Sequence, residues 1–387
     1  MKARFLLLWQ LLLVGLIYCQ SAGAVEQVVL VQNSGWMDPF YNDPESRLKP
    51  LIAALVRQTA TAENAIHVAS FNERTPDSPS PTLLYSGQAN GFSESLLKDL
   101  TIGTKKSGAW ADTNMIEAIA VAVREYLQNR SGVIWLLTNN RNSPDNDQRT
   151  AERNREFYAL LHESPHISRT IAFPVRMPLQ GARYESSGLM VYALAYGEAA
   201  GLALKQMVDS GVPQALRFIR PARLKPLDQD SVVIEPKDIE PPEVDVTPGP
   251  DGRSFVFDLD AALRPDAITL NADVRNLFFP YRIDSARLEY AFTDDKGRPL
   301  QIRSDPVVLS DIGPGESARV SFTVQVPVES IPSRWSAQSF AALGDTIQIP
   351  ATLRVRLADQ RLSIDPSFTK GIGELFPDDP ISEVFER

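Results

Sequence analysis

The sequence predicts an α/β domain with a doubly wound, mostly parallel sheet, followed by an all-β sandwich. In the first half of the chain, short runs of apolar, β-branched residues alternate with amphipathic helical patterns. This alternation is typical of strands covered by helices on both faces. A proline-rich stretch follows, and beyond it apolar and polar residues alternate with a period of two, as in antiparallel strands. The 387 residues are enough for two domains.

Composition narrows the class of protein. The chain has a net charge of −9, 43% hydrophobic residues and no cluster of basic residues. These values favour a globular protein and argue against nucleic-acid binding. The single cysteine, Cys19, lies in the N-terminal segment. A chain without that segment therefore has no disulfide, thiolate metal site or cysteine nucleophile.

Residues 1–24 have the pattern of a secretory signal peptide. Lys2 and Arg4 precede a short apolar run, and Ala22-Gly23-Ala24 offers a small-residue cleavage site. We expect cleavage near Ala24 and a mature protein that is periplasmic or secreted from a bacterium. An uncleaved anchor is the alternative, although the apolar run is short for a membrane span. No second run of that length follows, so the membrane is expected to matter only during export.

The α/β domain is expected over residues 25–222. Its first strand, Gln27–Gln32, is an apolar run that ends in the polar turn Asn33-Ser34-Gly35-Trp36-Met37. Open α/β sheets place their ligand sites at such turns, beyond the carboxyl ends of central strands. A second apolar run, Gly132–Thr138, ends in the same way at Asn139-Asn140.

The remaining elements of this domain follow from local patterns. Helices are expected where apolar residues recur every three or four positions, and strands where short β-branched runs occur. The expected helices are 46–60, 114–127, 147–161 and 201–209, and the expected strands are 65–71, 82–85, 168–175 and 189–196. Asp112 or Thr113 is expected to cap the second helix.

Three short motifs in this domain resemble the von Willebrand factor A domain. That family has Asp-x-Ser-Gly-Ser-Met after its first strand, and the chain has Gln32-Asn33-Ser34-Gly35-Trp36-Met37. Asp112-Thr113-Asn114 is similar to the threonine motif at the head of a middle helix, and Thr138-Asn139-Asn140 to the Thr-Asp-Gly motif of the family. The resemblance implies a site for a divalent cation, usually magnesium, at these turns.

The substitutions in these motifs remove charge from the implied metal site. Gln32 and Asn139 stand where the family has aspartate, and Trp36 stands where it has a hydroxyl. Ser34 and Thr113 remain as the two implied metal ligands. Mg²⁺ gives up water reluctantly, and carboxylates normally compensate for this. We therefore expect poor Mg²⁺ binding and no cofactor.

Three interpretations of this face remain open. Asp38 or Asp112 could restore a carboxylate, so that the site binds a divalent cation. Alternatively, the neutral side chains form a hydrogen-bonded cluster that ties the loops together. In the third interpretation the face binds a protein partner without metal, through aromatic side chains. The residues of the face are Gln32, Asn33, Ser34, Trp36, Asp38, Asp112, Thr113 and Asn139, with the aromatic Phe40, Tyr41 and Trp110 in the same loops.

A pattern that matches the zinc-protease motif His-Glu-x-x-His occurs at His162-Glu163-Ser164-Pro165-His166. That chemistry needs both histidines on one turn of a continuous helix. Pro165 disfavours helical geometry at Ser164, so the helix is expected to end there. A zinc hydrolase using His162, Glu163 and His166 is therefore an alternative that the sequence disfavours.

The second half of the chain is expected to hold a linker, a sandwich and a tail. Residues 223–250 are rich in proline and acids and predict an extended connector, of which a part such as 231–234 could add a strand to one domain. Residues 251–365 contain short alternating strands separated by turn signals, which predict an antiparallel sandwich. This part resembles immunoglobulin-like modules in general. Residues 366–387 form an acidic tail that the sequence assigns to neither domain.

Together these features predict an exported, non-enzymatic protein that binds or scaffolds a protein partner in the cell envelope, through the loops 33–41, 110–114 and 139–145. The sequence implies no nucleic-acid partner and no small-molecule substrate. Divalent-metal-dependent adhesion is the first alternative and zinc-dependent hydrolysis the second. The prediction of function rests partly on fold resemblance, which many unrelated functions share.

Overall fold

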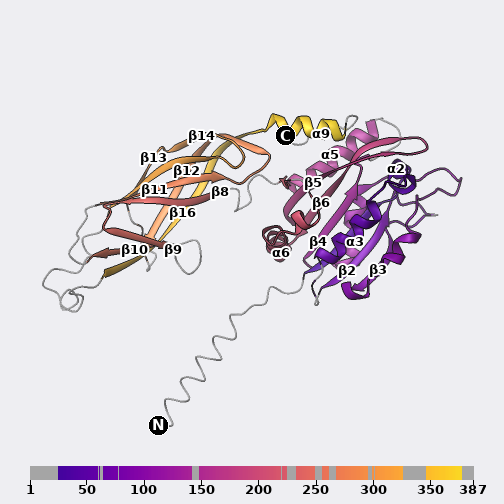
Figure 1. Ribbon diagram of the computed structural model, residues 1–387, viewed down its shortest axis with the longest axis horizontal. Helices are drawn as coiled ribbons and strands as arrows, with labels where there is room; N and C mark the ends of the chain where they lie inside the picture. The colour runs from indigo at the N-terminus through magenta and orange to yellow at the C-terminus, as the bar shows by residue number, and fades with distance from the viewer. Residues whose placement is uncertain are drawn as a thin grey trace, which may run out of the picture. The chain divides into compact units, whose positions relative to one another are not determined.

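The computed structural model (Figure 1) divides into two compact units, Met1–Asp228 with Ser367–Arg387, and Gln229–Pro366. The structure describes residues 25–59, 61, 64–76, 78–141, 148–218, 220–224, 232–248, 255–260, 267–294, 299, 301–325 and 346–376. The leader pattern at 1–24 and the end of the tail, 377–387, lie outside these residues. Within the described ranges, no helix is both long and apolar enough to cross a membrane.

The first unit is built on a seven-stranded mixed sheet with the order β3-β2-β1-β4-β6-β5-β7. Its strands are β1 (Glu26–Gln32), β2 (Ala65–Phe71), β3 (Thr82–Gln88), β4 (Gly132–Thr138), β5 (Ile167–Gln180), β6 (Glu185–Tyr196) and β7 (Ala222–Arg223). Among them, β2, β1 and β4 are parallel, and the outer pairings are antiparallel. The expectation of a mostly parallel sheet is corrected because β5 and β6 form a hairpin that pairs with β4 through β6.

The parallel strands are buried along almost their whole length. Every residue from Gln27 to Gln32 and from Gly132 to Thr138 is buried, as continuous apolar runs under helices should be. Gln32 pairs with Phe71 of β2. The carboxyl ends of β1, β2 and β4 therefore lie at one edge of the sheet, where their turns leave it.

One face of the sheet is covered by α3 (Leu48–Thr59) and α6 (Glu198–Asp209). Their apolar sides share one core with alternate residues of β1 and β4, since alternate strand residues point to the same face. The residues of β1 and β4 in this core are Val29, Val31, Val133, Trp135 and Leu137.

The opposite face is covered by α4 (Met115–Val121) and α5 (Gln148–Glu163). Met115 lies 3.5 Å from the hydroxyl of Thr138, and an edge-on ring pair joins α5 to β6. Gln32 is the next residue after one that points into the first core, so its side chain points to this second face. It lies at the end of β1, beside the start of α4.

The β5–β6 hairpin is longer than the sequence predicts. The expected strands 168–175 and 189–196 extend to a turn at residues 181–184. This turn lies beside η1 (Gly35–Met37) and α2 (Asp38–Asn42). The backbone N–H of Gln180 donates to the carboxylate of Asp43 at 2.7 Å. The hairpin tip therefore belongs to the same edge as the turn after β1.

The second unit consists of two antiparallel sheets that share one core. The sheet orders are β14-β12-β16-β10-β9 and β13-β15-β11-β8. Residues of β11 alternate between buried and half-buried, as a period of two predicts. The strands are β8 (Val232–Glu240), β9 (Val244–Pro248), β10 (Phe255–Asp260), β11 (Ala267–Asn276), β12 (Tyr281–Asp294), β13 (Ile302–Asp305), β14 (Val308–Ile312), β15 (Ser317–Gln325) and β16 (Thr346–Ile364).

The stretch expected as a linker, 223–250, contributes β8 and β9 to the second unit. Both strands lie at the edges of their sheets. Pro236 falls where the pairing of β8 with β11 shifts register, between Asn271 and Ala272. Edge strands and bulges tolerate proline because no N–H is needed for the ladder there. Proline content therefore does not mark the domain boundary in this chain.

The tail expected at 366–387 begins with a helix, α9 (Pro366–Leu375), that packs with the first unit. Phe368, Ile372 and Phe376 are buried. Leu375 Cδ2 lies 3.0 Å from where a Cβ on Gly188 of β6 would be. The first unit is thus completed by a segment that follows the second unit in the sequence.

Candidate functional site

The side-chain amide of Gln32 lies among the turns that follow β1 and β4. Its nitrogen is 2.7 Å from Ser34 Oγ, 2.9 Å from Thr113 Oγ1 and 3.2 Å from the carbonyl oxygen of Arg141. Gln32, Ser34 and Thr113 are all fully buried. One neutral side chain therefore connects three segments that are far apart in the sequence.

The oxygen of the same amide accepts hydrogen bonds from the turn after β4. The backbone N–H of Asn139 donates to Gln32 Oε1 at 3.2 Å, and the Thr138 hydroxyl donates to it as well. A backbone N–H can only donate, so the amide oxygen faces Asn139 and the amide nitrogen faces the two hydroxyls. The Gln32 carbonyl accepts the Tyr41 hydroxyl at 2.8 Å. Burial raises the pKa of Tyr41, so this hydroxyl keeps its proton.

The arrangement does not fit a magnesium ion. The oxygens of Ser34 and Thr113 both face a hydrogen-bond donor, the Gln32 nitrogen. Mg²⁺ in proteins is held by carboxylates and water in octahedral geometry, and the groups that meet here are hydroxyls, an amide and backbone atoms. Across the described ranges, no group of three or more His, Cys, Asp or Glu side chains is placed to hold a metal ion.

Asn139 joins the turn after β4 to the turn after β1. Its amide nitrogen donates to the carbonyl of Trp36 at 2.8 Å, and its amide oxygen accepts the backbone N–H of Arg141 at 3.2 Å. The backbone N–H of Gly35 donates to the carbonyl of Ala111 at 3.0 Å. The three motif segments therefore meet at one edge of the sheet and are held by neutral hydrogen bonds.

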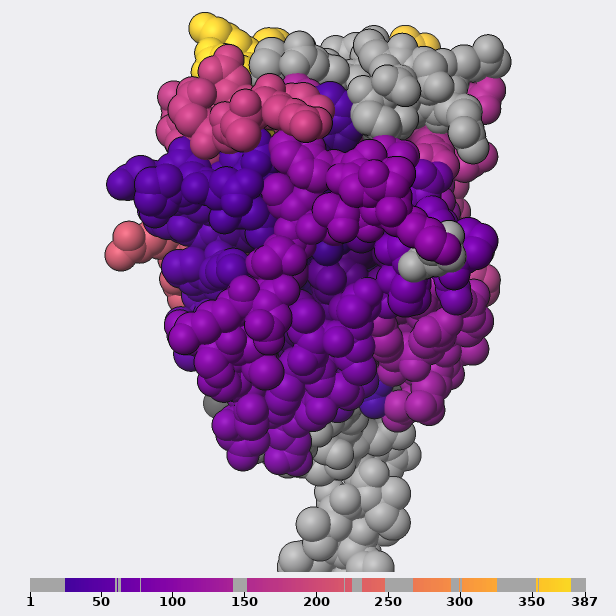
Figure 2. Space-filling model, turned by 90° about the vertical axis from the view of Figure 1, so that its right-hand side faces the viewer, coloured from indigo at the N-terminus to yellow at the C-terminus, as the bar shows by residue number. Residues whose placement is uncertain are grey.

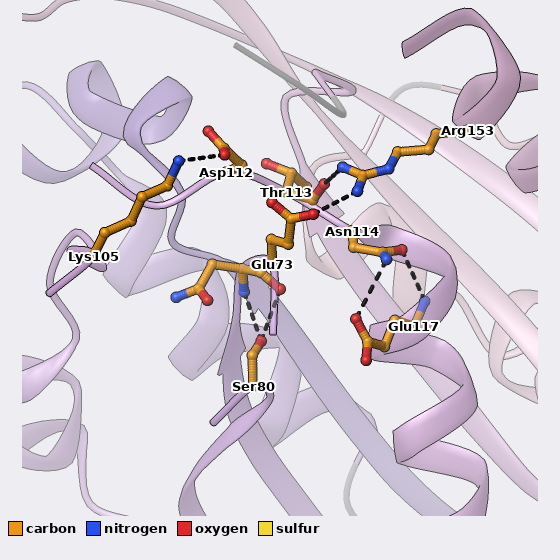
Figure 3. A network of polar contacts seen from close by, with 9 residues as sticks. Glu73, Ser80, Lys105, Asp112, Thr113, Asn114, Glu117 and Arg153 are labelled. Carbon is orange, nitrogen blue, oxygen red and sulfur yellow. Dashed lines mark hydrogen bonds and ion pairs between the residues drawn. The ribbon is translucent and has the colours of Figure 1, made fainter. Parts of the chain in front are cut away.

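Asp112 is engaged by a lysine (Figure 3). Its carboxylate lies 2.5 Å from Lys105 Nζ, and its carbonyl accepts the backbone N–H of Glu73 at 2.7 Å. The next carbonyl, that of Thr113, accepts from Arg153 at 3.2 Å, and the Arg153 guanidinium also pairs with Glu73. Asp112 thus fixes the loop before α4, and its carboxylate does not contact the Gln32 amide.

Asn114 is the residue that caps α4. Its side-chain oxygen accepts the backbone N–H of Glu117 at 3.1 Å. The sequence suggested Asp112 or Thr113 for this role, but the helix begins at Met115, so the cap falls later. Because Asn114 caps the helix, the Thr113 hydroxyl is left to accept from Gln32.

Asp38 is fully buried and anchors the β5–β6 turn. Its carboxylate accepts from Asn42 Nδ2 at 2.6 Å and from the backbone N–H of Arg183 at 3.2 Å. A Cβ on Gly181 would lie 2.4 Å from Asp38 Oδ2, so the turn reaches this carboxylate because residue 181 is glycine. Asp38 therefore supplies no carboxylate to the two hydroxyls.

Asn33 takes part in a separate network. Its side-chain oxygen accepts from Asn72 Nδ2 at 3.1 Å, and its side-chain nitrogen donates to the carbonyl of Thr101 at 3.1 Å. Its backbone N–H donates to the carbonyl of Phe71 at 2.8 Å. Asn33 holds the turns after β1 and β2 together and does not contact the Gln32 amide.

Aromatic and cationic side chains gather on the same edge. The rings of Trp36 and Tyr184 lie 4.4 Å apart between centroids, and those of Tyr184 and Trp110 lie 6.1 Å apart. The guanidinium of Arg141 lies 4.5 Å over the Trp36 ring, and that of Arg183 lies 4.3 Å over the Trp110 ring. Arg183 is exposed and the other four are half-buried. We call these five residues the edge cluster.

The edge cluster is assembled from segments that are distant in the sequence. In Figure 2 the indigo segment after β1, the purple loops before α4 and the pink tip of the β5–β6 hairpin lie side by side. Gly35 allows the close approach of two of these segments, because a Cβ there would lie 2.6 Å from Trp110 Cβ.

The two histidines of the zinc-protease-like pattern do not share a helical turn. α5 ends at Glu163, as Pro165 predicts. His166 lies in the following turn, and its ring packs 6.2 Å from that of Tyr196. The geometry that a His-Glu-x-x-His zinc site requires is therefore not formed by this segment.

Sequence reasoning did not place Arg183 and Tyr184 on this face. Arg183 and Tyr184 follow Gly181 in the turn between β5 and β6. A short glycine-containing stretch between two apolar strands is a hairpin signal, and it could have placed both residues at the edge that also holds Trp36. Arg141 lies in the loop 139–145, which the sequence assigns to the binding face.

Comparison with known proteins does not assign this chain to a family. No protein-family model matches the chain, and no curated protein matches it. Among solved structures, the pilus adhesin (RrgA) from Streptococcus pneumoniae is similar at 10% sequence identity and a TM-score of 0.21. The match covers 89% of this chain and 62% of the adhesin chain. A similarity at this TM-score supports no argument about fold or function.

Proposed function

We propose that this chain is an exported, non-enzymatic binding protein of the bacterial cell envelope. It recognises protein partners through the edge of its α/β unit, which we interpret as a von Willebrand factor A-like domain with a degraded metal site. The parallel centre and the order β3-β2-β1-β4, shared with doubly wound sheets, support this interpretation. So does the meeting of the three motif segments around one amide. The leader pattern of residues 1–24 supports export.

The observation that carries the proposal is the edge cluster. Tryptophan, tyrosine and arginine are the residue types that contribute most binding free energy at protein interfaces. The cluster presents all three types on turns that partly buried hydrogen bonds hold in place. Preorganised turns lower the entropy cost of binding a partner. A surface of this kind suits recognition of a protein segment.

We propose that this recognition needs no divalent cation. The neutral amide of Gln32 supports this, because it already donates to the hydroxyls that would be metal ligands. Metal-dependent adhesion would need Asp38 or Asp112 to turn toward those hydroxyls. Both carboxylates are held by other partners, Asn42 in one case and Lys105 in the other.

The proposal also excludes hydrolysis by a zinc centre. The end of α5 between His162 and His166 supports this part. Zinc content measured by elemental analysis of the purified protein tests it directly. One zinc ion bound per chain, together with a hydrolase activity, would contradict the proposal if His162→Ala abolished both. That result would favour the zinc hydrolase.

Site-specific photocrosslinking tests the proposed function. A photoreactive amino acid at the exposed turn residue Ala182 is expected to crosslink a defined protein partner in cells that export the full chain. Leu202 is the matched control, because it is 58% exposed on α6, a helix that begins beyond the opposite end of β6. The crosslinked product at Ala182 is expected to form in the presence of a chelator as well. It is expected to be absent from the Trp110→Ala variant.

Three results would overturn the proposed function. One is the same set of crosslinked products at Ala182 and Leu202, which would indicate unspecific contacts. Another is the absence of any product at Ala182. The third is loss of the Ala182 product in chelator and its return with Mg²⁺, which would favour metal-dependent adhesion.

A further inference from the structure

Each tryptophan of the edge cluster has an arginine guanidinium over its ring. Arg141 lies 4.5 Å over Trp36, and Arg183 lies 4.3 Å over Trp110. Tyr184 has ring contacts with both indoles. A guanidinium that packs over an indole can still donate N–H groups to a ligand. A carboxylate suits it, because a carboxylate can accept two parallel hydrogen bonds from one guanidinium.

Two carboxylates of the neighbouring described segments, those of Asp38 and Asp112, are already engaged. Asp38 accepts from Asn42 and from the backbone N–H of Arg183, and Asp112 pairs with Lys105. Considering the described residues alone, no carboxylate forms an ion pair with the Arg183 side chain, which is exposed. Arg183 therefore gives the edge cluster an exposed cationic group beside aromatic rings, on a chain whose net charge is −9.

We propose that the edge cluster binds an acidic peptide segment of the partner. A glutamate or aspartate carboxylate binds the Arg183 guanidinium, and a neighbouring apolar side chain packs against Tyr184 and Trp110. This inference rests on the proposed function, because it names the chemistry of the partner at the same face. Charge-assisted hydrogen bonds supply specificity, and the rings supply apolar area.

The arginines over the indole rings disfavour two other classes of ligand. Saccharides and nucleobases stack on open aromatic faces. Here each indole has a guanidinium over one face, and the Tyr184 ring lies against Trp36 at 4.4 Å. The surface presents a guanidinium beside aromatic rings. Such a surface is complementary to a carboxylate next to an apolar group.

Fluorescence anisotropy with the full mature chain tests this inference. The probe is a short fluorescein-labelled peptide of repeated Glu-Phe-Glu-Gly units, and the matched control peptide has glutamine in place of glutamate. We expect the acidic peptide to bind about tenfold more tightly, and its affinity to fall as salt is added. Arg183→Gln is expected to reduce the affinity about tenfold, and Arg183→Lys to restore it only in part.

Arg130→Gln is the matched control variant. Arg130 is an exposed arginine just before β4, at the opposite edge of the sheet, and pairs with Glu26 at 2.7 Å. The Arg130→Gln variant is expected to bind the acidic peptide with unchanged affinity. Thermal melts check that each variant is folded. Because Arg183 is exposed and its backbone makes the bond to Asp38, Arg183→Gln is expected to keep the wild-type melting temperature.

The outcomes separate this inference from the proposed function. Equal affinity for the two peptides, or unchanged affinity in Arg183→Gln, overturns the acidic-peptide inference. If crosslinks at Ala182 persist in that case, the proposed function still stands. Tighter binding to polygalacturonate than to the acidic peptide would assign the surface to an acidic saccharide and would also overturn the inference.

Discussion

Gln32 Nε2 lies 2.9 Å from Thr113 Oγ1, and this hydrogen bond connects the end of β1 to the start of α4. A cation would have to replace that donor in order to use the Thr113 hydroxyl. The same amide also bonds to Ser34 and Asn139, so a single neutral side chain holds the loops that a metal ion would otherwise organise. We regard this hydrogen-bonded connection as the structural basis of the edge cluster.

Replacing Gln32 with leucine is expected to destabilise the α/β unit. The substitution leaves the N–H of Asn139 without its acceptor, and removes the donor to the Ser34 and Thr113 hydroxyls. Each buried polar group without a partner costs about 1–3 kcal/mol, so the expected loss is about 2–4 kcal/mol. Urea unfolding followed by tryptophan fluorescence measures it, because Trp135 lies in the core of this unit.

Gln27→Leu is the control for that experiment. Gln27 is a buried glutamine at the other end of β1, and its side-chain oxygen accepts only from Trp135 Nε1 among the described residues, at 2.9 Å. Its loss should cost about 1–2 kcal/mol, since one buried donor is left unpaired. If Gln27→Leu destabilises the protein as much as Gln32→Leu, the account of Gln32 as a special connection is wrong.

Gly35→Ala is expected to displace Trp110. The new Cβ would lie 2.6 Å from Trp110 Cβ and 2.8 Å from Cε3, closer than carbon atoms can approach. Overpacking of this kind costs about 1–3 kcal/mol, and the near-ultraviolet circular dichroism of the tryptophans should change. Gly373→Ala is the control, because no atom lies within 4 Å of its added Cβ. An unchanged spectrum in Gly35→Ala would show that the contact is not as tight as described.

His67 is expected to make stability depend on pH. Burial lowers its pKa, opposed by Glu26 and reinforced by Arg130, and its ring stacks on Tyr126 at 5.7 Å. In the unfolded protein the pKa of His67 is about 6.5. Above that pH the imidazole is neutral in both the folded and the unfolded protein, and the protein has its full stability. As the pH falls below that value, the unfolded state takes up more protons and stability is lost.

Urea midpoints measured from pH 7.5 to 5 test this expectation. His67→Gln should lose less stability over that range than the wild type, since it removes the titrating group. Acids elsewhere titrate in both proteins, so the difference between the two curves is the informative quantity. Identical pH dependence in the two proteins would contradict the assignment to His67.

The helix α9 is expected to dock through its buried face. Ile372 is 1% exposed, and Ile372→Ala should cost about 2–4 kcal/mol of docking free energy. Hydrogen exchange is the suitable measurement, because a helix held by few buried side chains can open without global unfolding. Amides of α9 should exchange faster while those of β1 stay protected.

Gly371→Ala is the matched variant for α9. Residue 371 is exposed and no atom lies within 4 Å of its added Cβ. Alanine is favoured over glycine in a helix by about 0.8–1.0 kcal/mol, so exchange in α9 should slow. Faster exchange in Gly371→Ala, or no change in Ile372→Ala, would mean that α9 is not held as described.

The centre of the fold could be predicted from local sequence. The apolar runs of β1 and β4 were predicted nearly to their ends, because strands buried on both faces have few polar positions. The meeting of Ser34, Thr113 and Asn139 was expected from the resemblance of their three motifs to those of a known family. Their grouping around Gln32 agrees with that expectation.

Features that depend on distant contacts could not be predicted in the same way. The hairpin tip with Tyr184 reaches Trp36 only because β6 pairs with β4 and Asp38 holds the turn. Nothing in the residues near Asp38 indicates that its carboxylate accepts a backbone N–H from residue 183. The prolines and acids of residues 223–250 predicted a connector, but β8, which contains Pro236, is an edge strand, where proline is tolerated.

The most direct test of the central claim is a titration of the mature protein with Mg²⁺ and Mn²⁺, by calorimetry and by thermal shift, with Thr113→Ala as control. A ligand that binds only the folded state must raise the melting temperature. We expect no heat and no shift at millimolar metal, because the Ser34 and Thr113 hydroxyls already accept from Gln32. A saturable shift that disappears in Thr113→Ala would contradict the account and establish a working metal site.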